Sequence, residues 1–377
     1  MVGHRENRVW PVWVTVKNSM KVVGAIFSNN ECLDKLNSDL VSKCFFMAYS
    51  NSWGIKGTIL QKVYFVNTYL FSKLWFTAQC FKLDLKMLNN ILSKALSFVF
   101  SGENEKPVRP LIFRDRNLGG LGLINPIVKS KALLVKNMYK DFLEHDCDIH
   151  DQWIVDNLYG YPEEFIYVFS NDLAMAPVKH IYNFLLQDVI YRKESLIPSR
   201  NEKRSVNVKW SLAWRNLNLM KGLTSTEKCF AWKVQQDLLP VGSRIHRINA
   251  ERRCLSLLQN NQPCDEVQTL EYCFSKCDNI AEAYEALIAV LSDYLGRDVT
   301  FKEVVHFSFN HRNKKRLLLA LWFAVKIMFQ IFHEKSLNKS HLFHILIKEC
   351  EWYISMNRKL GSLGEVIKLK DIIVTYA

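Results

Sequence analysis

The stretch from Leu85 to Val99 reads LKMLNNILSKALSFV, and it decides the fold class. Its apolar side chains recur at steps of three and four residues, the spacing that places them on one face of an α-helix. Lys and Asn occupy the positions between them and would face water. The stretch therefore predicts an amphipathic helix. Its apolar positions are Leu88, Ile91, Leu92, Ala95 and Leu96.

The same periodicity recurs along much of the chain and makes the predicted fold mainly α. One helical pattern runs from Gln61 to Phe76, and another from Ser130 to about Leu143. The apolar stretch from Leu317 to Phe332 is interrupted by a Lys and a Gln. It is shorter than a bilayer span needs, so we predict a buried helix there. Further helical patterns are Ile181 to Tyr191, Trp210 to Met220, Glu227 to Leu239, Ile280 to Leu295, Arg316 to Phe332 and His341 to Ile354.

The amino-terminal segment carries a β signal. β-branched and aromatic residues form two groups, Trp10 to Val16 and Val22 to Phe27, on either side of Asn18-Ser19. Such a pattern predicts a short β-hairpin with its turn at Asn18-Ser19. The expected fold is therefore mainly α, with helical thumb-like and carboxy-terminal helical units and a short amino-terminal β-hairpin.

Breaks in the periodicity suggest three segments. Gly and Pro interrupt it from Ser101 to Pro126, and a polar, irregular stretch follows from His145 to Pro162. Pro198 and the polar run Ser199 to Ser205 mark another break. We predict a hairpin and helical unit at 1–145, a helical connector at 146–240, and a cysteine-bearing segment with a terminal helical bundle at 241–377.

Composition limits the classes of protein that the chain can belong to. Hydrophobic residues make up 49% and aromatic residues 12%, which excludes a disordered polymer. Lys and Arg number 50 against 37 Asp and Glu, a formal net charge of +13. That excess suits a polyanionic partner, because each neutralised phosphate releases counterions. Contact with acidic lipids, or charge that is simply solvated, would give the same balance.

The ten cysteines are expected to be free thiols or metal ligands. Met1 to Pro11 holds charged residues and no apolar core, so we do not predict a signal peptide. Without secretion, disulfides are disfavoured. The expected location is nuclear or cytoplasmic, with no membrane partner. The tryptophans, Trp53 included, lie mostly in apolar surroundings, so we expect them to be core anchors rather than base-stacking platforms.

Two stretches in the first half of the chain resemble parts of a known family. Lys21 to Phe27 reads KVVGAIF and is followed by Trp53-Gly54 and by Lys62 to Phe76. This order resembles the primer-grip hairpin and first thumb helices of non-LTR (LINE-type) retrotransposon reverse transcriptases. The second stretch, Arg109-Pro110-Leu111 through LGGLGL at Leu118 to Leu123, is similar to the turn that follows the thumb in that family.

A third stretch resembles the terminal zinc-binding segment of the same enzymes. It begins at FAWK, Phe230 to Lys233, and LLP, Leu238 to Pro240. It continues through basic residues to the cysteines. The three stretches together run from about Lys21 to Cys277, and their order and spacing carry the resemblance. It implies a fragment from the RNA-directed DNA polymerase family of transposable elements, which would bind template RNA or target DNA.

One departure from the family bears on catalysis. Reverse transcriptases place two adjacent aspartates on a hairpin, where they hold the two divalent ions that promote nucleotide transfer. This sequence has no Asp-Asp pair. We therefore expect no catalytic residues, no magnesium site and no polymerase activity in the chain by itself. We also expect the hairpin to pair poorly and to leave an exposed edge, because its partner sheet in the intact polymerase is missing.

The zinc-binding segment departs from the family as well. The usual first pair is Cys-x-x-Cys, but nine residues separate Cys254 from Cys264, and Tyr272 occupies the expected histidine position. Tyrosine is a poor zinc ligand beside thiolates. Cys254, Cys264, Cys273 and Cys277 could still form a four-thiolate zinc site, since the last two are one helical turn apart. The alternative is an eroded site whose cysteines pack as small apolar residues.

Two basic clusters are candidate nucleic-acid contacts. Glycines let a backbone approach phosphates, and neighbouring guanidinium groups can bind them. Arginines just before the cysteines suit RNA, as in zinc-ribbon-like modules. The first cluster is Lys106, Arg109, Arg114 and Arg116 around Gly119 and Gly120, and the second is Arg244, Arg247, Arg252 and Arg253. The alternative interpretation of the first cluster is a plain tight turn, and that of the second is a solvated helix face.

The function expected from the sequence is nucleic-acid binding without polymerase chemistry, with RNA or DNA and other retroelement proteins as partners. Two rivals stay open. One is a domesticated nucleic-acid-binding protein or an interaction scaffold that docks onto another polymerase chain. The other is a truncated genomic copy with no selected function. Salt dependence separates phosphate binding from apolar docking, because only the former releases many counterions.

Overall fold

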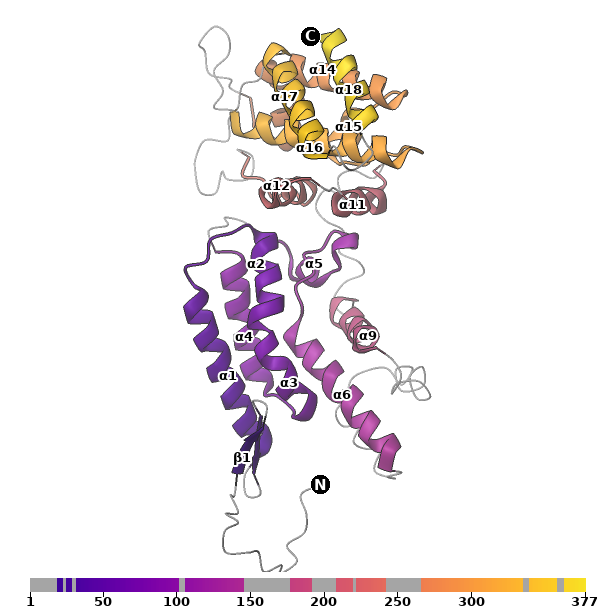
Figure 1. Ribbon diagram of the computed structural model, residues 1–377. Coiled ribbons are helices and arrows are strands. Elements are labelled where there is room, and N and C mark those ends of the chain that lie inside the picture. The colour runs from indigo at the N-terminus through magenta and orange to yellow at the C-terminus, as the bar shows by residue number, and fades with distance from the viewer. Residues whose placement is uncertain are drawn as a thin grey trace, which may run out of the picture. The chain divides into compact units, whose positions relative to one another are not determined.

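The computed structural model describes residues 19–22, 25–28, 32–101, 106–145, 177–191, 208–219, 222–241, 266–334, 339–357 and 363–377. These residues are mostly helical and hold a two-stranded sheet near the amino end (Figure 1). The predicted fold class, mainly α with a short amino-terminal hairpin, is confirmed.

The chain divides into two compact units, each built from two separate segments. Unit 1 comprises Met1–Ser101 and Leu123–Leu196, and unit 2 comprises Gly102–Gly122 and Ile197–Ala377. The glycine-rich stretch thus folds with the carboxy-terminal part of the chain. The boundaries expected at residues 145 and 240 stay a prediction.

The hairpin lies later in the sequence than predicted. Strand β1 (Ser19–Val22) pairs antiparallel with β2 (Ala25–Ser28), with Ser19 opposite Ser28. The predicted turn at Asn18-Ser19 is therefore wrong, because Ser19 belongs to a strand. Val22 pairs with Ala25, so the chain reverses after Val22. Asn18-Ser19 also lacks the glycine that a two-residue hairpin turn favours. The predicted first half, Trp10 to Val16, lies outside the described residues.

One edge of the hairpin is covered by a side chain. Asn37 on α1 (Leu33–Ser52) accepts from the backbone N–H of Ile26 and donates to its carbonyl, both at 2.8 Å. The fully buried Asn37 thus takes the place of a third strand beside β2. The expectation of poor pairing is wrong for these residues, since β1 and β2 pair along their whole length. Met20 nevertheless remains exposed.

The helices of unit 1 follow the sequence pattern closely. Helix α4 spans Leu85–Val99, as predicted, and the Asp84 carboxylate caps it by accepting from the N–H of Met87 at 2.7 Å. Helix α2 starts at a capping box, in which Thr58 and Gln61 bond reciprocally. Among the described residues, α2 spans Ile59–Phe65, and further helices of this unit are α3 (Ser72–Cys80), α6 (Pro126–His145) and α9 (Val178–Tyr191).

A π-helix, η1 (Val66–Leu70), joins α2 to α3 and changes which side chains face water. The N–H of Phe71 donates to the carbonyl of Val66 at 2.9 Å. In an unbroken α-helix, residues seven apart share a face, so Phe71 would be exposed like Tyr64, and Lys73 buried like Val66. Instead Phe71 is fully buried and Lys73 is exposed. The extra residue of the π turn therefore keeps the core side of both helices continuous.

Side-chain hydrogen bonds hold the chain where it re-enters unit 1. The Asn67 side chain accepts from the N–H of Ile124 at 2.9 Å. The Tyr182 hydroxyl accepts from the N–H of Asn125 at 3.0 Å. Burial raises the pKa of Tyr182 to about 12, despite the opposing effect of that hydrogen bond. These bonds fix the start of α6 against η1 and α9.

Unit 2 is a helical assembly around α16 (Lys314–Glu334). Residues 319–325 are all buried, and α16 contacts α12, α14 and α17. The segment Lys314–His333 is long and apolar enough to cross a membrane by length and composition, but 61% of its most apolar window is buried in the unit. Other helices of unit 2 are α5 (Arg109–Phe113), α11 (Trp210–Leu219), α12 (Ser225–Gln235), α14 (Asp278–Leu295), α15 (Phe301–Val305), α17 (Lys339–Asn357) and α18 (Leu363–Tyr376).

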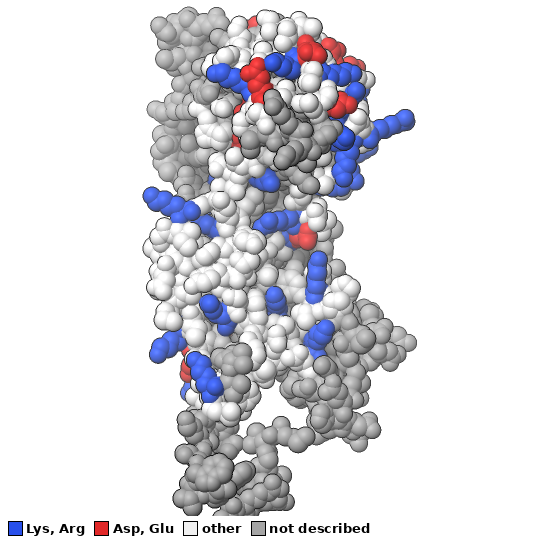
Figure 2. Space-filling model, viewed as in Figure 1, with Lys and Arg blue, Asp and Glu red and all other residues white. Residues whose placement is uncertain are grey.

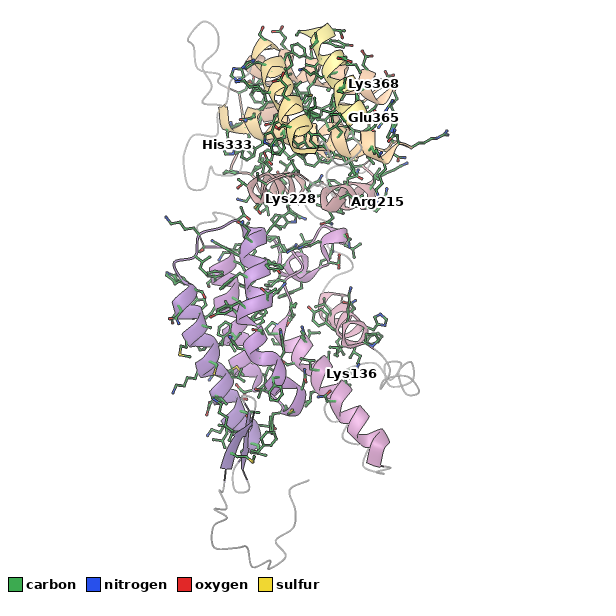
Figure 3. The ribbon with its side chains drawn as sticks, in the orientation of Figure 1. Lys136, Arg215, Lys228, His333, Glu365 and Lys368 are labelled. Atoms are coloured by element: carbon green, nitrogen blue, oxygen red, sulfur yellow. The ribbon has the colours of Figure 1, made fainter. Side chains whose placement is uncertain are left out.

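Ion pairs connect α16 to its neighbours. Arg316 Nε donates to Glu365 of α18 at 2.8 Å; Figure 3 labels Glu365 on that helix. Near the middle of α16, Lys326 Nζ lies 2.7 Å from Glu227 of α12 and 3.5 Å from Glu349 of α17. Burial raises the pKa of Glu349, and Lys326 partly opposes that rise. The Lys326 site is thus a largely buried charge network that joins three helices.

A buried histidine should make unit 2 sensitive to acid. Burial, and secondarily the charge of Lys302, lowers the pKa of His306 from 6.5 to about 4. The unfolded chain therefore binds a proton that the folded chain excludes, so stability is full above pH 6.5 and falls as the pH drops toward 4. The expected loss is on the order of 3 kcal/mol.

The measurement is denaturant unfolding of the full chain and of His306→Gln at several pH values between about 7.5 and 4, which bracket the two pKa values. The variant should lose less stability than the wild type over this range, because glutamine has no proton to gain. Parallel pH curves for the two proteins would contradict the assignment to His306.

Candidate nucleic-acid interface

A long stretch of unit 1 carries positive charge without negative charge. From Leu40 to Leu83 the sequence has five Lys and no Asp or Glu. Four of these lysines are exposed, whereas Lys62 is buried and its Nζ donates to the Ser101 hydroxyl at 2.7 Å. Figure 2 shows blue side chains standing among white ones on the visible face of unit 1, while blue and red mix in unit 2. The exposed lysines are Lys43, Lys56, Lys73 and Lys82.

Exposed aromatic rings accompany these lysines. Tyr64 is 65% exposed, Trp53 60% and Tyr69 42%. Lys73 Nζ lies 4.8 Å from the centre of the Tyr69 ring, close enough for a cation–π interaction. Because Trp53 is exposed, its predicted role as a core anchor is wrong. Trp214, Trp232 and Trp322 are buried core residues, as expected.

The tyrosine face is the outer side of α2, η1 and α3. Its small hydroxyl groups are engaged with the backbone, since Thr68 donates to the carbonyl of Tyr64 at 2.8 Å and Ser72 to that of Tyr69 at 2.7 Å. Its exposed cation and rings are therefore its main binding groups. The tyrosine face consists of Tyr64, Thr68, Tyr69, Ser72, Lys73 and Phe76.

The predicted glycine-rich site lies in unit 2 and forms a tightly bonded turn. A short 3-10 helix, η2 (Arg116–Leu118), ends at Gly119, whose φ of 82° suits glycine. The N–H groups of Gly119, Gly120 and Gly122 donate to the carbonyls of Arg116, Asp115 and Arg114, at 3.0 to 3.1 Å. The glycine amides are thus already used within the turn. A phosphate would have to be held by side chains instead.

The glycines also let the turn dock against neighbouring helices. The Gly119 carbonyl accepts from Trp232 Nε1 at 3.1 Å and from Gln236 Nε2 at 2.7 Å, both at or just beyond the carboxyl half of α12. A Cβ on Gly119 would overlap the Trp214 ring, and one on Gly120 would overlap the carbonyl oxygen of Arg114. Packing therefore accounts for both glycines, and their contact with nucleic acid stays a prediction.

The basic residues around the turn differ in accessibility. Lys106 and Arg109 are exposed, whereas Arg114 is buried. Arg116 Nε donates to the Leu121 carbonyl at 3.1 Å, and burial lowers the pKa of Arg116 while Asp115 partly offsets this. Lys106 and Arg109 are therefore the members of this cluster best placed to reach a ligand.

The second basic cluster and half of the cysteine set lie outside the described residues. These are Arg244, Arg247, Arg252, Arg253, Cys254 and Cys264. Cys273 is half-buried in the π-helix η3 (Tyr272–Lys276), and Cys277 is buried at the start of α14. Within the part of the chain that the structure describes, no group of three or more His, Cys, Asp or Glu could hold a metal ion. The four-thiolate zinc site stays a prediction.

The structure brings two of the family-like stretches together, because Gly119 of LGGLGL is bonded to Trp232 of FAWK. The chain matches no known protein-family model. A search of curated proteins also gives no match. The resemblance to reverse transcriptases stays a prediction from the residues alone.

The lysine-rich stretch could have been found from the sequence. A run this long without Asp or Glu is visible to a simple scan of charge along the chain. The tyrosine face could not be read in the same way, because helical periodicity places Lys73 on the buried side. Only the π turn moves it to the surface beside Tyr69.

Proposed function

We propose that this chain binds nucleic acid through unit 1, without polymerase chemistry of its own. The observation that carries the proposal is the stretch from Leu40 to Leu83, which offers four exposed lysines, exposed rings and no carboxylate. Exposed lysines attract a phosphate backbone, and exposed rings add contacts to bases. The resemblance to the thumb of LINE-type reverse transcriptases supports RNA or DNA as the ligand.

The resemblance also suggests the setting in which the chain works. A chain of this kind would act beside other retroelement proteins in the nucleus or cytoplasm. The missing Asp-Asp pair supports binding rather than DNA synthesis. A zinc ion at Cys254, Cys264, Cys273 and Cys277 would belong to unit 2 and is separate from the proposed binding surface.

The test is binding of a fluorescent structured RNA and of a matched duplex DNA over a series of salt concentrations. A variant with Lys43, Lys56, Lys73 and Lys82 changed to Gln should bind more weakly at every salt concentration. Each lost phosphate contact lowers the log–log salt slope by about 0.7 to 0.9. The slope should therefore fall by up to about 3.6 if all four lysines contact phosphates.

A matched control removes the same charge from unit 2. The control changes Lys276, Lys302, Lys348 and Lys368 to Gln, all of which are exposed. This control variant should keep most of the affinity for nucleic acid and most of the log–log salt slope. Equal losses in both variants would refute the assignment to unit 1, and a shallow slope in the wild type would favour apolar docking to a partner. A third variant, Lys106→Ala with Arg109→Ala, measures the contribution of the glycine-rich turn.

A further inference from the structure

We propose that the tyrosine face binds unpaired nucleic acid, with Tyr64 stacking on a base and Lys73 contacting the sugar–phosphate backbone beside it. This inference rests on the proposed function and names the form of nucleic acid that unit 1 selects. Single strands expose the flat faces of their bases, whereas a duplex buries them in its own stack. A surface that presents aromatic rings therefore favours the single strand.

Tyr64 has the properties of a stacking platform. It is the most exposed of the large hydrophobic and aromatic side chains in the described part of the chain. Its ring contacts no other ring there, whereas Tyr69 lies 5.0 Å from Phe65 and Trp53 lies 5.5 Å from Tyr49. Stacking an exposed aromatic ring on a base is favourable, because it removes the surface of the ring and that of the base from water.

The π turn provides the spacing between ring and cation. The π turn closes between Val66 and Phe71, with Tyr64 before it in α2 and Tyr69 within it. Lys73 follows one α-helical turn later and already lies over the Tyr69 ring. Tyr64, Tyr69 and the Lys73 ammonium group are thus all on the water-exposed side of this helical segment. A strand lying along this side would place successive bases and phosphates against them.

The geometry also explains why the chain retains a π turn. Such turns are rare, and they are frequent at functional sites. Here the extra residue leaves the core undisturbed, since Phe71 and Leu74 are fully buried after the turn. Its effect on the outside is that Lys73 is exposed and lies over the Tyr69 ring. The insertion therefore both keeps Phe71 in the core and leaves Lys73 exposed beside the Tyr69 ring.

The experiment measures fluorescence anisotropy of the full chain with a labelled unstructured single strand and with the duplex of the same sequence. Tyr64→Ala should weaken single-strand binding about 5- to 100-fold, the range expected for one lost stacking contact. Duplex binding should change little. Tyr64→Phe keeps the ring and should bind like the wild type. Met47→Ala removes a side chain of similar exposure, 62%, from α1 of the same unit and should have no effect.

The outcomes separate this inference from the proposed function. Salt-sensitive binding that is unchanged in Tyr64→Ala, or equally weakened for single strand and duplex, overturns the stacking inference and leaves nucleic-acid binding intact. Absence of binding to any nucleic acid by the folded wild-type chain overturns both. Circular dichroism of each variant confirms that the helices of unit 1 are retained, and Tyr64→Phe tests the ring without removing it.

Discussion

Gly120→Ala is expected to destabilise unit 2 by about 3 kcal/mol or more. The added Cβ would overlap the carbonyl oxygen of Arg114, which is part of the backbone and cannot rotate away as a side chain can. That same carbonyl accepts the N–H of Gly122 at 3.0 Å. Moving it would disrupt the turn that the neighbouring Gly119 anchors to α12.

The matched controls are other glycines of unit 2. Gly364 lies in α18 with no atom within 4 Å of the place that a Cβ would occupy, so Gly364→Ala should be neutral or stabilising by about 0.5 to 1 kcal/mol. Gly296 has a φ of +66° but open space around it. Gly296→Ala should therefore cost only the backbone strain, about 1 kcal/mol. Gly119→Ala would strain the backbone, because φ is positive there, and its Cβ would also overlap the Trp214 ring. Its loss of stability should therefore be similar to that of Gly120→Ala.

Denaturant unfolding followed by tryptophan fluorescence is the suitable measurement, because Trp214 and Trp232 both touch the turn. If Gly120→Ala were as stable as Gly364→Ala, the turn would not be held as described. Binding of RNA by the Gly120 variant, measured below its unfolding transition, then shows whether the turn also contacts nucleic acid. Unchanged affinity would leave packing as the whole explanation of these glycines.

The extent of the helices was predictable where apolar spacing is regular and the cap is visible. Leu85–Val99 matches its prediction because Asp84 precedes a clear apolar face. The helix predicted to start at Glu227 begins two residues earlier, at Ser225, because Thr224 and Glu227 form its capping box. The hairpin was displaced because β-branched residues indicate strands without defining their register.

Features of the candidate site that depend on contacts between distant residues were not predictable. Nothing local to Gly119 shows that its carbonyl will be bonded by Trp232 and Gln236, more than a hundred positions away. Likewise, an i to i+7 pattern assigns Lys73 to the buried side, and the π turn that reverses this has no signature in the sequence. The positive charge of the stretch from Leu40 to Leu83 could be predicted from the sequence, but which of its side chains face water could not.

The buried ion network around Lys326 gives the second large effect. Lys326→Met should destabilise unit 2 by about 3 to 5 kcal/mol, because it leaves Glu227 buried without a cation. Glu349, 3.5 Å from the same ammonium group, loses its partner as well. The loss should be measured at neutral pH by denaturant unfolding. Lys370→Met, which breaks an exposed pair with Glu351 at 2.8 Å, should change stability little.

A double variant and a pH series identify the cause of the stability loss in Lys326→Met. Adding Glu227→Gln to Lys326→Met removes the uncompensated charge and should restore most of the stability, since glutamine can still accept from the N–H of Thr224 and complete the capping box. In the single variant, the pKa of Glu349, already raised by burial, would rise further without the opposing charge of Lys326. A carboxyl whose folded pKa is raised destabilises the protein as the pH rises, so the penalty of Lys326→Met should shrink from about pH 7 toward about pH 5. A penalty independent of pH, and not relieved by Glu227→Gln, would contradict this cause. Lys326 would then stabilise unit 2 mainly through its contacts with the Trp322 and Trp352 rings, whose centres lie 5.3 and 5.4 Å from its Nζ.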